Sequence, residues 1–170
     1  PVCSGNPIHL TATAETGSTY NWTGPNGYTS TQQNPTITNT TTGQSGIYSV
    51  TSTLNGCTST AGTTTITINQ TVTPSVTIAT ATGKNTFCAG ETVTFTATPK
   101  NGATTPGYQW KVNGISVGGN TSVYSTTNVN TNDVISCTMT SNLQCASPLT
   151  ANSNTLTITG VNFTPSVTIS

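Results

Sequence analysis

The chain has 170 residues, of which 31% are hydrophobic and 4% are charged, and its three basic and three acidic residues balance to a net charge of zero. So few cations argue against a nucleic-acid partner, because binding depends on neutralising several phosphates, and against an anionic membrane surface. No stretch approaches the roughly 18 to 20 apolar residues of a membrane-spanning helix, so membrane insertion is not expected. Threonine is the most frequent residue and suits half-buried pleated surfaces, which favours β structure with an uncharged polar exterior.

The chain repeats one pattern twice. Residues 3–13 match residues 88–98 without a gap, and a Tyr-x-Trp motif follows in each copy. Two further matches are GIYSVTSTLNGC with DVISCTMTSNLQC (46–57 with 133–145) and TITI with TLTI (65–68 with 155–158). A self-similarity this long predicts two homologous domains in tandem, residues 1–70 and 71–163.

The first copy reads as a series of short strands. Ile8, Leu10 and Ala12 alternate with polar residues, which predicts a strand that points them inward. The next strand places Trp22 inward and turns back through a longer loop that contains Pro25 and Gly27. A later alternating strand begins near Tyr48, and the copy closes on residues 65–68.

The second copy begins with an extra predicted strand at residues 74–78 and continues as the first does. Phe95 points inward on one strand and Trp110 on another, and Asn113-Gly114 in KVNGISV suits a two-residue hairpin turn with positive φ. No segment has helical periodicity. We therefore predict an all-β fold of two tandem antiparallel β-sandwiches with essentially no helix.

These phrases resemble a known class of repeat. The inward tryptophan, Tyr48 near the start of a strand and the length of each copy are similar to immunoglobulin-like domains. CSG, YNWTGPNG and NGC, with FCAGETVTFTATP, GYQWKVNG and NDVISCTMTSN, resemble the immunoglobulin-like or PKD-like repeats of large surface adhesins from gliding, type IX-secreting bacteria. The resemblance implies domains that space or display others, and it brings no catalytic residues.

The cysteines indicate an oxidising compartment. Five cysteines in such a chain suggest disulfides and one thiol left over. Since Cys3 matches Cys88 and Cys57 matches Cys145, we predict the pairs Cys3–Cys57 and Cys88–Cys145. Cys137 is then a free thiol, which we expect to be buried and inert.

Residues capable of catalysis or metal binding are sparse. Catalysis needs convergent groups, but His9 is the only histidine and alternation points it to solvent. Glu91 and Asp133 have no acidic counterpart in the first copy, and no clustered acids suggest a calcium site. We expect no enzyme activity, no cofactor and no metal.

Trp22 and Trp110 occupy equivalent positions on alternating strands, so we interpret them as core residues with Tyr48 and Phe95. Tyr28 follows the Gly24–Gly27 loop and has no aromatic counterpart. If any residue contacts a glycan it is Tyr28, with Asn26 beside it; the alternative is a tyrosine that packs on its own hairpin.

The segment TPSVTI at 73–78 recurs at 164–169, near the end of the chain. Only two residues precede Cys3, so the first domain is expected to lack its own first strand. We expect Thr164, Pro165, Val167 and Ile169 to form the first strand of a following module, in the continuing polypeptide or in a neighbouring copy by strand addition. A loose tail at a fragment boundary is the alternative.

Three functions remain open. The leading hypothesis is a non-catalytic stalk or spacer of an extracellular bacterial surface adhesin or filament, with adjacent copies joined head-to-tail. The second is a module that binds a surface polysaccharide through exposed loop residues. The third is an accessory domain of a secreted enzyme.

Overall fold

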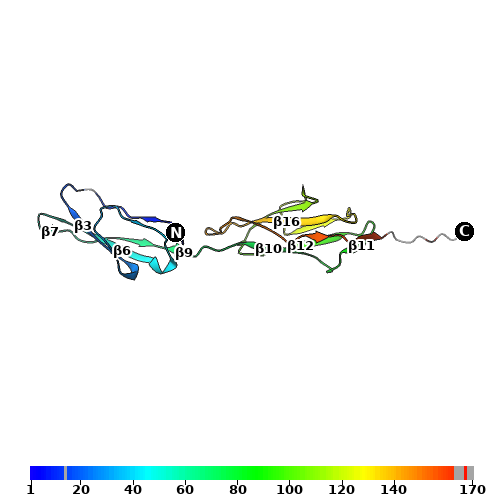
Figure 1. Cartoon of the computed structure of the whole chain (residues 1–170), viewed down its shortest axis with the longest axis horizontal. Helices are drawn as coiled ribbons and strands as arrows, with labels where there is room; N and C mark the ends of the chain where they lie inside the picture. Colours follow the sequence, from blue (N-terminus) through cyan, green and yellow to red (C-terminus); the bar gives the residue numbers. More distant parts are fainter. Residues whose placement is uncertain (14, 163–166, 168–170) are drawn as a thin grey trace. The chain divides into compact units, whose positions relative to one another are not determined.

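A computed structural model describes residues 1–13, 15–162 and 167, which fall into two compact units, Pro1–Thr71 (unit 1) and Val72–Ser170 (unit 2). Apart from two single-turn 3-10 helices, η1 (Pro25–Gly27) and η2 (Thr42–Gln44), the regular structure of the described residues is β-strand (Figure 1). The predicted all-β fold is confirmed.

Unit 1 is a sandwich whose larger sheet has β3 (Thr19–Gly24) between β4 (Tyr28–Ser30) and β6 (Gly46–Leu54). The opposite edge of β6 pairs with β7 (Cys57–Thr58) and β8 (Gly62–Ile66). The second layer has β2 (Ile8–His9) antiparallel to β5 (Thr36–Ile37), and β1 (Val2–Cys3) lies parallel to β9 (Ile68–Asn69).

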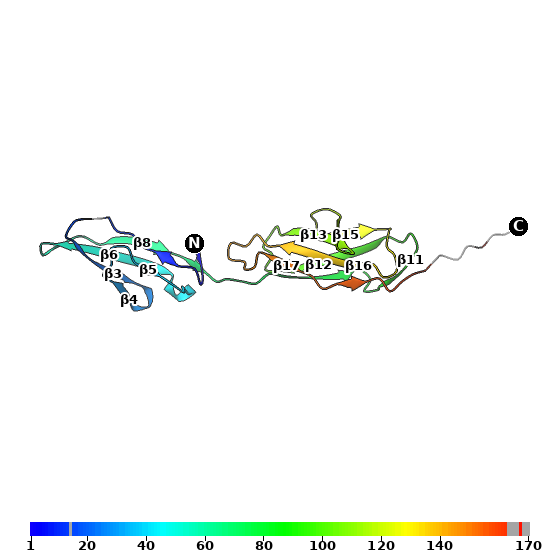
Figure 2. The same ribbon diagram turned by 45° about the horizontal axis from the view of Figure 1, so that its top comes forward.

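Unit 2 repeats this arrangement. Its larger sheet has the order β14 (Ile115–Val117), β13 (Gly107–Val112), β16 (Val134–Thr140), β17 (Thr150–Asn152), with β18 (Leu156–Thr157) also paired to β16. β11 (Thr86–Cys88) lies parallel to β19 (Gly160–Asn162), as β1 does to β9. The facing sheet has β12 (Val93–Lys100) between β10 (Ser75–Thr80) and β15 (Val123–Thr126). Figure 2 labels β12 and β15 of this sheet.

The topology of each unit is that of an immunoglobulin-like sandwich. A first-edge strand parallel to the last strand, a facing sheet and a four-strand layer built on a central tryptophan strand define it. The two-residue turn predicted between β13 and β14 is present, with Asn113 and Gly114 at φ of 52° and 80°.

Each core contains a buried tryptophan at the equivalent position. Trp22 and Trp110 are 2% and 0% exposed, and each indole N–H donates a hydrogen bond to a backbone carbonyl, that of Gln32 at 3.0 Å and that of Thr121 at 2.9 Å. Tyr48 and Phe95 are fully buried beside them. A buried indole with its N–H satisfied combines a large apolar contact with a fixed orientation.

The predicted disulfide pairs are wrong. Cys57 and Cys88 carry free, exposed thiols, whereas Cys3 and Cys145 are each disulfide-bonded. The repeat shows which cysteines occupy equivalent positions in the two units. It does not show how far apart the two cysteines of one unit lie.

That distance follows from the strands. In unit 1, Cys3 pairs with Asn69 beside the Gly46 end of β6, while Cys57 pairs with Leu54 at the other end, beyond a nine-residue strand. At about 3.3 Å per residue the two cysteines lie far beyond the roughly 7 Å between Cα atoms that a disulfide tolerates. Figure 1 shows β7 and β9 at opposite ends of unit 1.

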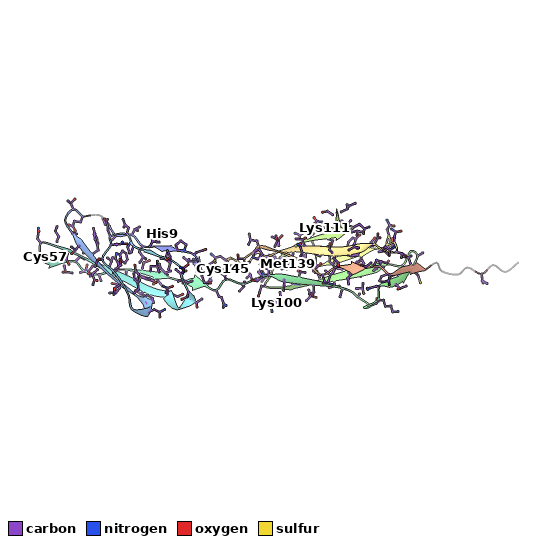
Figure 3. All side chains as sticks on the ribbon, in the orientation of Figure 1. His9, Cys57, Lys100, Lys111, Met139 and Cys145 are labelled. Carbon is purple, nitrogen blue, oxygen red and sulfur yellow. The ribbon has the colours of Figure 1, made fainter. Side chains whose placement is uncertain are left out.

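Unit 2 has the same separation. Cys88 pairs with Asn162, near the end where β16 begins, and Cys145 follows the end of β16 at Thr140. Figure 3 shows Cys145 at one end of this unit, and Figure 1 shows β11 at the other.

Candidate functional site

A groove lies at one edge of unit 1. It lies between residues 11–13, which continue β2, and β8, and it has a volume of about 330 Å³. Tyr20, Trp22, Val50 and Ser52 contribute to its lining. We call it the open-edge groove.

In unit 2 the corresponding place is filled by β10. This strand pairs with β12 over its whole length, from Ser75 opposite Lys100 to Thr80 opposite Phe95. It also packs against β16 and β17. Its alternate residues Val76, Ile78 and Thr80 are buried, so β10 closes the sandwich at this edge. The described part of unit 1 contains no counterpart of β10.

Residues near this edge are more exposed in unit 1 than the matching residues are in unit 2. Three positions that are almost inaccessible in unit 2 are half-buried at the matching places in unit 1. The pairs are Ala97 (3% exposed) and Ala12, Cys137 (1%) and Val50, and Met139 (0%) and Ser52.

The backbone of residues 11–13 also faces an unoccupied edge. The amides of Leu10 and Ala12 donate toward the other side, to the Pro35 carbonyl at 3.0 Å and the Asn34 side chain at 3.1 Å. Strand alternation therefore turns the backbone groups of Thr11 and Thr13 to the open edge. Among the described residues none hydrogen-bonds the backbone of Thr11, and Thr13 accepts only from the Tyr20 hydroxyl, at 3.1 Å. Such an edge is a template for an additional strand.

The chemistry-bearing side chains are dispersed. His9 is exposed, as alternation predicted, and its Nδ1 lies 3.0 Å from the Thr36 hydroxyl. Glu15 accepts a hydrogen bond from the Ser18 hydroxyl, and Glu91 from the Cys88 backbone amide. Within the described residues no three His, Cys, Asp or Glu side chains come together as metal ligands, nor is any helix long and apolar enough to span a membrane.

Asp133 has a role that the sequence interpretation missed. It is 8% exposed, and its carboxylate accepts hydrogen bonds from the side-chain amide of Asn113 at 2.7 Å and the backbone amide of Asn130 at 2.8 Å. It therefore ties the β13–β14 turn to the loop before β16. Asn113 and Asp133 are 20 residues apart in the sequence, and no local pattern links them, so this contact was not predicted.

Tyr28 packs against Tyr48 of β6, beyond its own β3–β4 hairpin. It is half-buried, and its ring meets that of Tyr48 edge to face, with centroids 5.7 Å apart and planes at 66°. Asn26 forms the turn itself, with φ of 54°. The large exposed apolar side chains of the described residues are all aliphatic, so no planar aromatic platform for a sugar accompanies Tyr28.

Cys137 is 1% exposed, and its thiol is free. Burial raises the pKa of this thiol, and a hydrogen bond with the backbone of Gln109 opposes that shift. A buried thiol with a raised pKa is a poor nucleophile.

The residues expected to form an inter-module strand lie mostly outside the described residues. Of Thr164, Pro165, Val167 and Ile169, only Val167 is described, and it is 90% exposed. The groove was not predicted from the sequence, because its lining from β6 and β8 comes from positions far from residues 11–13 in the chain.

The fold places this protein among immunoglobulin-like β-sandwich proteins. No family model and no curated protein matches its sequence. A chain in a crystal structure of the mouse coronavirus receptor-binding domain complexed with its murine receptor is 15% identical, with 92% of this chain and 94% of that chain covered and a TM-score of 0.48.

Murine CEACAM1b is 16% identical over 94% of both chains, with a TM-score of 0.45. The N-terminal four immunoglobulin domains of Dscam1 isoform 7.44 are 16% identical, with 96% of this chain and 42% of that chain covered and a TM-score of 0.41.

Proposed function

We propose that the chain is a non-catalytic structural repeat, a stalk or spacer, of an extracellular bacterial surface adhesin or filament whose modules are joined head-to-tail. The observation that carries this proposal is the equivalence of the two units, which share strand pairings and the tryptophan anchor. In a repeat array each module contacts only its neighbours, so modules of equivalent structure suit joining in series.

Further features support an extracellular stalk. Cys3 and Cys145 are disulfide-bonded, and structural disulfides are typical of proteins outside the reducing cytoplasm. The phrases shared with surface repeats of type IX-secreting bacteria support placement on a bacterial surface. Most threonine side chains on the strands are exposed, as suits an uncharged stalk.

A polysaccharide-binding function is less well supported. Its best candidate, Tyr28, already uses its ring against Tyr48. A glycan array would reverse this preference if the wild-type chain bound a glycan and Tyr28→Ala abolished that binding.

Sedimentation velocity and negative-stain electron microscopy of the full chain at increasing concentration test the proposal. We expect a series of species of regularly increasing length, because a head-to-tail contact does not close on itself. Monomers at every concentration, or a single closed dimer, would overturn the proposal.

A further inference from the structure

We propose that the open-edge groove of unit 1 binds residues 164–170 of a second copy of this chain, as a strand added beside residues 11–13. This inference rests on the proposed head-to-tail assembly and names the surface and the segment that perform it. The occupant is identified by sequence: residues 164–169 repeat Thr73–Ile78 letter for letter. The earlier copy of that sequence forms most of β10, the strand that fills the equivalent place in unit 2.

The register of β10 gives the register of the added strand. Thr98 lies opposite Thr77, and Ala97 opposite Ile78. Transferred to unit 1, Thr13 lies opposite Thr168 and Ala12 opposite Ile169.

The added strand would pair with the free backbone groups at the edge and cover the half-buried residues of the groove. Its backbone pairs with that of Thr11 and Thr13, which face the open edge. Val167 and Ile169 take the inward positions of Val76 and Ile78, and cover the half-buried Ala12 and Val50. Ser166 and Thr168 take the outward positions of Ser75 and Thr77, which are exposed in unit 2.

The first experiment compares sedimentation of three forms of the full chain. Val167→Asp combined with Ile169→Asp places charge on the inward positions, and we expect only the mass of a single chain. Ser166→Asp combined with Thr168→Asp adds the same charge on the outward positions, and we expect assembly as in the wild type. Deletion of residues 164–170 should behave as the inward variant.

The outcomes distinguish failure of the groove inference from failure of the proposed head-to-tail assembly. If the wild type assembles and the deletion variant assembles equally well, the groove inference is overturned and head-to-tail assembly stands. If the wild type never assembles, both fail.

Register is tested by disulfide trapping in a Cys57→Ser, Cys88→Ser background. Thr13→Cys mixed with Thr168→Cys should form a covalent dimer, since paired residues in adjacent strands have Cα atoms about 4.5 to 5.5 Å apart. Thr11→Cys mixed with Thr168→Cys, displaced by two residues, should form at least tenfold less. Equal yields would overturn the register.

A second inference comes from the cysteines. Cys57 and Cys88 occupy the repeat positions of Cys145 and Cys3, yet they carry free, exposed thiols while their equivalents are disulfide-bonded. A partner for each within its own unit is excluded, because the two positions lie at opposite ends of the long strand in each unit. We infer that Cys88 of one copy forms a disulfide with Cys57 of the next.

The bond needs an oxidant, and a small disulfide such as oxidised glutathione suffices. The Cys88 thiolate attacks it and releases one glutathione thiolate. The Cys57 thiolate then attacks the Cys88 sulfur of the mixed disulfide and releases the second. Two cysteines have lost two protons and two electrons, and oxidised glutathione has become two glutathione thiols.

Mixing single variants tests this pairing on a non-reducing gel. Cys57→Ser alone and Cys88→Ser alone should each give no dimer with oxidised glutathione, because each lacks one partner of the bond. An equimolar mixture should give dimers and no longer products, while the wild type gives a ladder. Dimers of either variant alone at the yield of the mixture, or no dimer in the mixture, would overturn the inference.

Discussion

The side chain of Asn154 brackets the backbone of Ile78. Its Oδ1 accepts a hydrogen bond from the Ile78 amide at 2.8 Å, and its Nδ2 donates one to the Ile78 carbonyl at 3.1 Å. The amide thus acts as a short strand and joins β10 to the segment between β17 and β18. This contact fixes β10 on the side away from β12, and it shows how unit 2 holds the strand that closes it.

We predict that Asn154→Ala loosens β10 without unfolding unit 2. Each lost hydrogen bond is worth about 0.5 to 1.5 kcal/mol, so exchange of the Ile78 amide should quicken by about tenfold or more in amide-exchange NMR. Asn128→Ala is the matched control, since Asn128 is exposed and its side chain has no hydrogen bond to the described residues. Equal exchange in both variants would contradict this role.

We predict that Trp110→Ala destabilises unit 2 alone. Trp110 is fully buried, contacts the rings of Phe95 and Tyr124, and satisfies the Thr121 carbonyl. Removing a buried tryptophan costs about 3 to 5 kcal/mol. In hydrogen exchange with increasing urea, β16 peptides should exchange earlier and β6 peptides at the wild-type urea concentration. An equal shift in both would show that the units do not unfold separately.

Tyr28→Ala should weaken unit 1 through its ring and not through its hydroxyl. An aromatic pair contributes about 0.5 to 1.5 kcal/mol beyond its buried area. Urea unfolding followed by Trp22 fluorescence in a Trp110→Phe background measures this. Tyr28→Phe is the control and should be within about 0.5 kcal/mol of wild type; a loss as large as that of Tyr28→Ala would show that the hydroxyl matters.

Stability should fall in alkali. Burial raises the pKa of Tyr48 and Tyr108 above 10.0 and that of Cys137 above 9.0. The folded state therefore keeps these protons at a pH where the unfolded state has released them. The resulting contribution to the free energy of unfolding is complete below pH 9 and is lost as the pH rises further.

Thermal unfolding at pH 7, 9, 10 and 11 checks the sign. The midpoint temperature should decrease at each step above pH 9. Cys137→Ala should lessen the decrease between pH 9 and 10, since it removes the group with the lowest ordinary pKa, 9.0 against 10.0 for the two tyrosines. A midpoint that rises from pH 9 to 11 would contradict the assignment.

Thiol titration should find two classes in the monomeric chain. Cys57 and Cys88 are exposed and should react with a thiol reagent within seconds to minutes, whereas Cys137 should react only after denaturant is added. Cys57→Ser and Cys88→Ser should each remove one fast equivalent. Three fast thiols would show that Cys137 is accessible.

Much of the fold could be predicted because strand alternation depends on neighbouring residues, and the repeat can be seen by aligning the sequence with itself. Ile8 is buried and His9 exposed as period two requires, and Asn113-Gly114 turns the hairpin as its positive φ requires. The cysteine pairing failed because equivalence between copies says which positions correspond, and the length of β6 decides which of them can meet. The groove escaped prediction for a similar reason: Ala12 and Val50 are brought together only by the sandwich.

The central claim is that residues 164–170 of one copy pair with the edge of unit 1 in another, and exchange of the Thr11 amide measures it most directly. In the full chain, amide-exchange NMR should show protection of Thr11 that increases with protein concentration, because a second copy supplies its acceptor. In the chain without residues 164–170, Thr11 should exchange rapidly at every concentration. Protection of Thr11 that is the same in both chains and independent of concentration would contradict the account.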